Sequence, residues 1–143
     1  MRLPVELVSF DKWSAFKGPF PTKDKEHRIV IIYKFDDTVS YFYVTSYESN
    51  DEKQKIDLAN RKDISSIAEL KKEDWDALTK DSCVQCNLAH RHEINLADLQ
   101  TWYVSGGIEY IGIVPDIIRS KIIDATCRSP TFTEEQKRLY TTD

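Results

Sequence analysis

The pattern of hydrophobic and polar positions is clearest in two consecutive segments in the first third of the chain: an apolar run behind a basic start, and a run in which apolar and polar residues alternate. Residues 27–35 and 39–46 are rich in β-branched and aromatic side chains, and only three polar residues, at positions 36–38, separate them. Two such segments joined by so short a polar connection are typical of a β-hairpin. The pattern therefore predicts two antiparallel strands, with the start of the first beside the end of the second.

Weaker patterns predict the remaining elements. They are a strand or irregular lead-in at 1–16, a break at 18–21, an exposed loop at 22–26, a loop with one short edge strand at 47–61, a helix within 65–78, strands at 82–87 and 93–96, a turn at 106–107, and helices at 115–127 and 133–140. Pro115 suits a first helical turn, and residues 133–136 have the spacing of a capping box. We therefore expect an α+β fold with a small, strongly bent, mostly antiparallel sheet and C-terminal helices.

Length and composition are those of an ordinary single domain. The 143 residues include 41% hydrophobic and 31% charged side chains, so one domain covering residues 1–143 is expected. No apolar stretch approaches the roughly 18 residues that a membrane span needs, and the N-terminus lacks a signal-peptide pattern. We therefore expect a cytoplasmic protein without a membrane partner. The net charge of −4 argues against broad attraction to nucleic acid but is compatible with a local basic groove.

The predicted hairpin brings two chemically suggestive side chains together. Pairing around Asp36 and Asp37 places Arg28, at the start of one strand, near Thr45, at the end of the other. A cation beside a hydroxyl can bind a phosphate. The alternative is that Arg28 is a surface arginine paired with Asp24 or Glu26.

Two other groups of residues have both a functional and a structural interpretation. Cys83, Cys86, His90 and His92 include the ligand types of a zinc site. Residues three apart on a strand point to opposite sides, however, and buried free cysteines are commoner, so we expect no metal and no cofactor. The tyrosines, particularly Tyr41 and Tyr43 on the predicted hairpin, are either platforms for stacked bases or core residues.

The order of several short motifs resembles the PemK/MazF family of toxins, which are small SH3-like barrels that cleave RNA. The matching segments, in chain order, are Gly18, His27–Ile32, Val44–Ser46, Leu78–Val84, Gly106–Gly107 and Pro115–Cys127. They correspond to a glycine-bearing loop, basic residues that open an apolar strand, a strand ending in Thr-Ser, a Leu-x-Lys-Asp-Ser segment, a glycine turn and a closing helix. The resemblance therefore implies a PemK/MazF-like, SH3-like barrel.

The resemblance also implies roles for individual residues. Arg28 would stabilise the charge of the transition state with its planar guanidinium, and Thr45 would orient a phosphate oxygen or the attacking hydroxyl. His27 would act as acid or base, because its ordinary pKa is near neutrality. The implied substrate-binding residues are Lys25, Ser46 and Gly18.

The expected function is that of a toxin in a toxin–antitoxin pair, a metal-independent endoribonuclease that acts on single-stranded RNA. Its expected partners are the RNA, an antitoxin protein and a second copy in a homodimer. The acidic balance, and Ile29 where the family has proline, favour an alternative: a catalytically inactive barrel that binds protein or nucleic acid. A small metal-binding protein is a third hypothesis.

Overall fold

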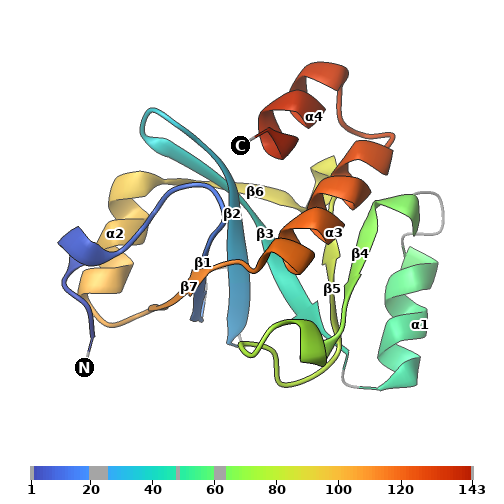
Figure 1. Ribbon diagram of the computed structural model, residues 1–143, viewed down its shortest axis with the longest axis horizontal. Coiled ribbons are helices and arrows are strands. Elements are labelled where there is room, and N and C mark those ends of the chain that lie inside the picture. Colours follow the sequence, from blue (N-terminus) through green and yellow to red (C-terminus); the bar gives the residue numbers. More distant parts are fainter. Residues whose placement is uncertain (1, 20–25, 48, 60–63, 143) are drawn as a thin grey trace.

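An antiparallel sheet forms the centre of the protein (Figure 1). The computed structural model describes residues 2–19, 26–47, 49–59 and 64–142. Its strands are β1 (Ser14–Gly18), β2 (His27–Phe35), β3 (Thr38–Ser46), β4 (Ile67–Leu70), β5 (Ser82–Gln85), β6 (Arg91–Asn95) and β7 (Glu109–Ile113). They lie in the order β4-β5-β3-β2-β1-β7, and β6 pairs with the half of β3 that β5 leaves free.

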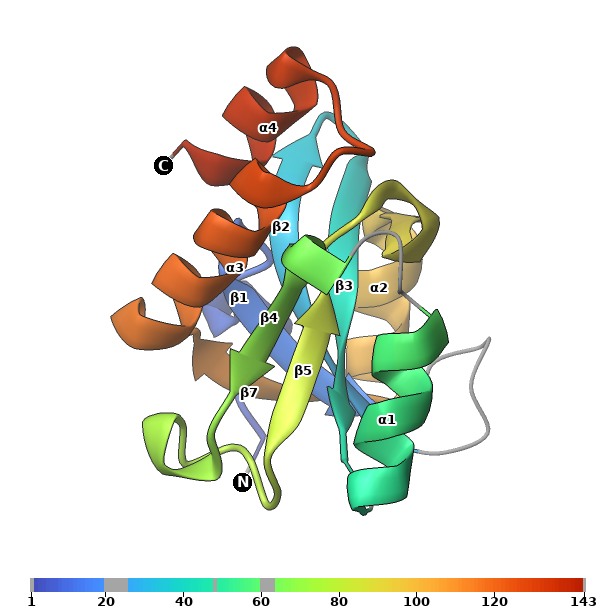
Figure 2. The ribbon, with the colours of Figure 1, turned by 90° about the vertical axis from the view of Figure 1, so that its right-hand side faces the viewer.

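Helices cover both faces of this sheet. They are α1 (Asn50–Ala59), α2 (Leu96–Val104), α3 (Asp116–Arg128) and α4 (Glu134–Thr141). Helices α3 and α4 pack on one face and α2 on the other, while α1 stands beside β4 and β5 (Figures 1 and 2). The expected α+β class, the antiparallel sheet and the C-terminal helices are therefore confirmed.

Strand β2 supplies both halves of the core. Val30 and Ile32 enter the cluster beneath α3, whereas Ile29 and Ile31 enter the cluster beneath α2, and all four are fully buried. Because both faces of the strand are covered, its sequence is a continuous apolar run rather than an alternation of apolar and polar residues.

Several local predictions are confirmed. The hairpin comprises β2 and β3, with Asp36 in its turn at a φ of 55°. Helix α3 begins directly after Pro115, and α4 begins with a complete capping box in which Thr133 and Gln136 bond each other's backbone. Local hydrogen-bonding chemistry determines these boundaries, so the sequence alone indicates them.

Other local predictions are wrong. Residues 47–61 include helix α1 rather than a loop with an edge strand, and residues 65–78 include strand β4 rather than a helix. Apolar residues three to five apart at 67–78 fit a helix, but pairing with β5 makes residues 67–70 a strand. Helix α2 and strand β7 are not predicted from the sequence.

The sheet is open. Strands β4 and β7 end the pairing order, and no pairing joins them within the described residues. The same part of the chain contains no helix with the length and apolar content that a membrane crossing needs.

Candidate functional site

The register of the hairpin separates the residues expected to bind a phosphate. Arg28 lies opposite Val44, not opposite Thr45. Since neighbours in a strand point to opposite faces, Arg28 shares a face with Ser46, while Thr45 lies on the other face. His27 lies on the face of Thr45, and its ring contacts that of Tyr43 at 5.7 Å. The expected meeting of Arg28 and Thr45 on one surface does not occur.

A β-bulge causes this separation. Next to the turn, Phe35 lies opposite Thr38, and continuing that register would place Arg28 opposite Thr45. The register shifts between Ile31 and Tyr33. A shift of one residue exchanges the faces of every residue beyond it.

The remaining predicted residues lie in different surroundings. Gly18 is buried, and a Cβ at this position would lie 2.7 Å from the carbonyl oxygen of Gly107. Its lack of a side chain therefore serves packing. Arg28 is half-buried, and its Nε has no hydrogen-bond partner among the described residues. Glu26 lies 3.9 Å from Lys17 Nζ, and Lys25 lies outside the described residues.

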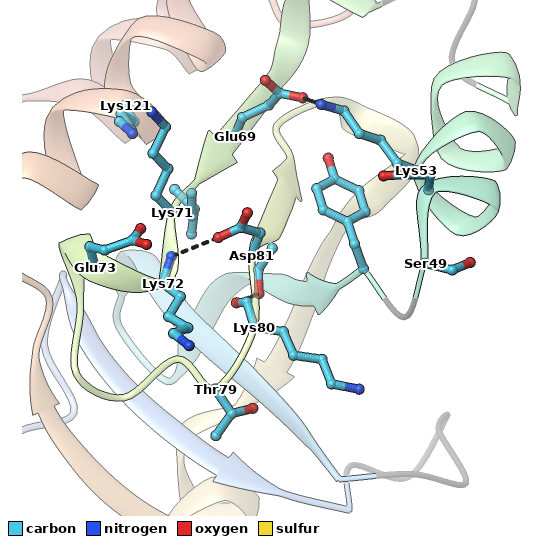
Figure 3. A pocket seen from close by; sticks show the side chains of 14 residues that line it. Ser49, Lys53, Glu69, Lys71, Lys72, Glu73, Thr79, Lys80, Asp81 and Lys121 are labelled. Atoms are coloured by element: carbon cyan, nitrogen blue, oxygen red, sulfur yellow. Dashed lines mark hydrogen bonds and ion pairs between the residues drawn. The ribbon is translucent and has the colours of Figure 1, made fainter.

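A lysine-rich pocket of about 880 Å³ lies beyond the end of β3 (Figure 3). Its walls come from the residue after β3, the start of α1, the end of β4, the segment before β5, and α3. We call it the lysine pocket. It is lined by Tyr47, Ser49, Asn50, Lys53, Glu69, Leu70, Lys71, Lys72, Glu73, Thr79, Lys80, Asp81, Ser82 and Lys121.

Positive charge exceeds negative charge in the lysine pocket. Five lysines and three carboxylates line it. Lys53 pairs with Glu69 at 2.9 Å, and Lys121 pairs with Asp74 at 2.9 Å. The carboxylate of Glu69 raises the pKa of Lys53, and the hydrogen bond from Lys121 lowers the pKa of Asp74.

A backbone contact holds Lys72, one of two adjacent lysines in the pocket, in place. The main-chain N–H of Lys72 donates a 3.0 Å hydrogen bond to Asp81 Oδ1, which joins the segment after β4 to the segment before β5 (Figure 3). Within the described residues, the side chains of Lys71 and Lys72 form no ion pair. The pocket therefore has two ammonium groups available for an anionic ligand.

Tyr47 lines the pocket on the side of α1. Its backbone N–H donates to the carbonyl oxygen of Asp81 at 2.9 Å, and the ammonium of Lys53 lies 5.8 Å from its ring centroid. Burial raises the pKa of the Tyr47 phenol. The phenol therefore stays neutral and presents an aromatic surface rather than a charge.

The lysine pocket includes a motif that carries the family resemblance. Four of its residues, Thr79 to Ser82, belong to the Leu-x-Lys-Asp-Ser segment, and Ser82 pairs with Ser46 in the sheet. The sequence does not predict a role for Lys53, Lys71 and Lys72, because nothing in it indicates that three separate segments converge. None of the chain's three histidines lines this pocket, so the arrangement suits anion binding better than proton transfer.

The four residues of the zinc hypothesis lie apart in the structure. Cys83 lies on the face of Thr45, its partner in the sheet, whereas Cys86 is in the cluster beneath α3. His90 Nδ1 lies 2.7 Å from Asn87 Oδ1, and His92 stacks on Tyr41 at 5.5 Å. Across the described residues, no group of three or more His, Cys, Asp and Glu side chains is arranged to hold a metal.

No protein-family model matches the chain, and no curated protein is significantly similar to it.

Proposed function

We propose that the protein binds single-stranded RNA in the lysine pocket. The observation that carries the proposal is the convergence of five lysines on one pocket of a chain whose net charge is −4. Phosphate groups are the commonest anions that such a cluster recognises, and backbone phosphates supply them in a row. The resemblance to PemK/MazF toxins supports RNA in particular, because residues 79–82 of its Leu-x-Lys-Asp-Ser segment line this pocket.

We further propose, from the same resemblance, that the protein is the toxin of a toxin–antitoxin pair and cleaves the bound RNA without a metal. The SH3-like barrel, the homodimer and the antitoxin partner belong to this proposal. Arg28 and Ser46 share the face that leads from β2 to the pocket residue Ser82. Arg28 is therefore the residue through which cleavage would act on the phosphate.

A second candidate function is RNA binding without cleavage. It is favoured by the separation of His27 and Thr45 from Arg28 on opposite faces of the sheet, because acid–base catalysis needs its groups within hydrogen-bond reach of one phosphate.

Replacing Lys71 and Lys72 together with alanine should weaken RNA binding at least tenfold. For every phosphate that the variant no longer neutralises, the slope of log affinity against log salt concentration should also fall by about 0.7. Fluorescence anisotropy with a labelled 12-nucleotide oligouridine measures both. The matched control is Lys34→Ala with Lys55→Ala, which removes the same charge outside the pocket. Equal decreases in affinity in the two variants would refute the proposed binding site.

Cleavage is tested by expressing the wild type, Arg28→Ala and Thr45→Val in bacteria and following growth and RNA length. We expect arrest and RNA fragments with the wild type, a decrease of at least about a hundredfold in cleavage with Arg28→Ala, and near-normal cleavage with Thr45→Val. Fragmentation that persists unchanged in Arg28→Ala would remove Arg28 from catalysis. RNA binding without any fragmentation by the wild type would establish the second function.

A further inference from the structure

The bulge in β2 creates a second feature, at the opposite end of the hairpin from the lysine pocket. Beyond the register shift, Tyr33 lies opposite Ser40, and Phe35 lies opposite Thr38. Both aromatic residues therefore point to the face that α4 covers, the same face as Ile32. Strand β3 spans nine residues between the two regions, which is about 30 Å.

These residues form one wall of a cleft of about 530 Å³. Its floor is Ser40, which is flanked in the sheet by Tyr33 on β2 and Glu93 on β6. The opposite wall is α4, which lies beside the end of β2 (Figure 2). We call it the aromatic cleft. It is lined by Tyr33, Phe35, Thr38, Ser40, Arg91, Glu93, Glu135, Gln136, Leu139 and Tyr140.

The two aromatic rings are nearly parallel. The planes of Tyr33 and Phe35 differ by 5°, and their centroids are 6.5 Å apart. A flat ring that stacks on both would need a separation of about 7 Å, since carbon atoms in contact are about 3.5 Å apart. Tyr33 is held by an edge contact with Tyr140 at 5.9 Å, whereas Phe35 is 69% exposed and has room to adjust. The centroid distance is an upper limit on the gap between the two planes, so a planar aromatic ligand fits between the rings once the exposed Phe35 ring has moved outward.

Polar groups at the edge of the cleft determine which hydrogen-bonding groups a bound aromatic ring should carry. Arg91 bonds the hydroxyl of Tyr140 and lies 3.4 Å from Glu93, while its buried Nε has no partner among the described residues. The carboxylates of Glu93 and Glu135 outnumber this single cation. An excess of carboxylates repels phosphate but accepts hydrogen bonds from ring N–H and amino groups.

We propose that the aromatic cleft binds a nucleobase, stacked between Tyr33 and Phe35, with guanine preferred. Guanine presents an N1–H and an amino group side by side, and one carboxylate accepts both. The base is proposed to belong to an RNA strand that the lysine pocket holds, and this part of the inference rests on the proposed function. The cleft and the pocket share no lining residue, so each is tested separately.

The test compares two labelled 12-nucleotide strands, one with a single guanine among uridines and one with an abasic site in its place. Phe35→Ala should weaken binding of the guanine strand at least about fivefold and leave the abasic strand unchanged. The control is Leu7→Ala, which removes an apolar side chain of similar exposure, 67%, outside the cleft. Glu93→Gln should reduce the preference for guanine over adenine.

Equal effects of Phe35→Ala on both strands, or no effect on either, would overturn the proposal. A fall in molecular mass on Phe35→Ala, measured by light scattering, with RNA binding unchanged would identify the cleft as a protein contact instead. Titration with guanosine monophosphate, followed by NMR shifts of the Phe35 and Ser40 amides, needs no strand in the lysine pocket. Shifts there without RNA binding would support the cleft and reject the proposed function.

Discussion

At the scale of single residues, close packing explains why position 18 is a glycine, although the sequence analysis assigns it to substrate binding. Gly18 is expected to bind substrate, but it lies across from His27 in the sheet and against the backbone of Gly107 and Ile108. A Cβ at this position would lie 2.7 Å from a carbonyl oxygen and 3.1 Å from the Cα of Ile108. Backbone atoms cannot move aside as a flexible side chain can, so only glycine fits.

Gly18→Ala should therefore lower the free energy of unfolding by about 1–3 kcal/mol, the usual cost of overpacking a well-packed site. Urea denaturation followed by tryptophan fluorescence measures it. Gly107→Ala is the matched control, since a Cβ there meets the carbonyl oxygen of Trp102 at 3.4 Å and has room. If both variants are equally stable, the packing argument for Gly18 fails.

At the scale of elements, local signals are sufficient for some segments and misleading for others. The hairpin, α3 and the capped start of α4 follow from turn residues, Pro115 and the Thr133 capping box. Helix α1 has few apolar residues and so gives no helical pattern. The spacing of apolar residues around β4 favours a helix, and the pairing with β5 that makes β4 a strand is not visible in that spacing. Nothing in the residue pattern of 27–35 reveals the bulge between Ile31 and Tyr33.

That bulge has two consequences for function. On one side of it, Arg28 is moved from the face of Thr45 to the face of Ser46. On the other side, Tyr33 and Phe35 face α4 and form a wall of the aromatic cleft. The tyrosines that the sequence offers for base stacking, Tyr41 and Tyr43, are instead 5% and 8% exposed and belong to the core beneath α2.

At the scale of the whole molecule, several weak acids are buried in their neutral forms. Burial raises the pKa of the Cys83 thiol to about 11, and it raises the pKa of Cys86, Tyr41 and Tyr47 as well. Each folded-state pKa lies above the value in the unfolded chain. The stability linked to these groups is therefore fully present below the unfolded pKa values and is lost as pH rises toward the folded values.

The free energy of unfolding should accordingly be nearly constant between about pH 7 and 8 and fall between about pH 8.5 and 11. The free energy of unfolding should fall by up to about 1.4 kcal/mol per pH unit for each proton that the unfolded chain has released and the folded protein still holds. Urea denaturation across this range measures the fall. Replacing Cys83 and Cys86 with alanine should delay its onset toward the range where tyrosines titrate. Constant stability up to pH 11 would contradict this account of burial.

The sequence by itself determined the α+β class, the hairpin and the C-terminal helices, because apolar runs, turn residues and caps act over a few positions. Tertiary structure alone decided which side chains share a surface. The lysine pocket draws on α1, the segment after β4, the segment before β5 and α3, and the aromatic cleft draws on β2, β3, β6 and α4. The face of each β2 residue depends on a one-residue shift in pairing, and pairing is a property of two strands together.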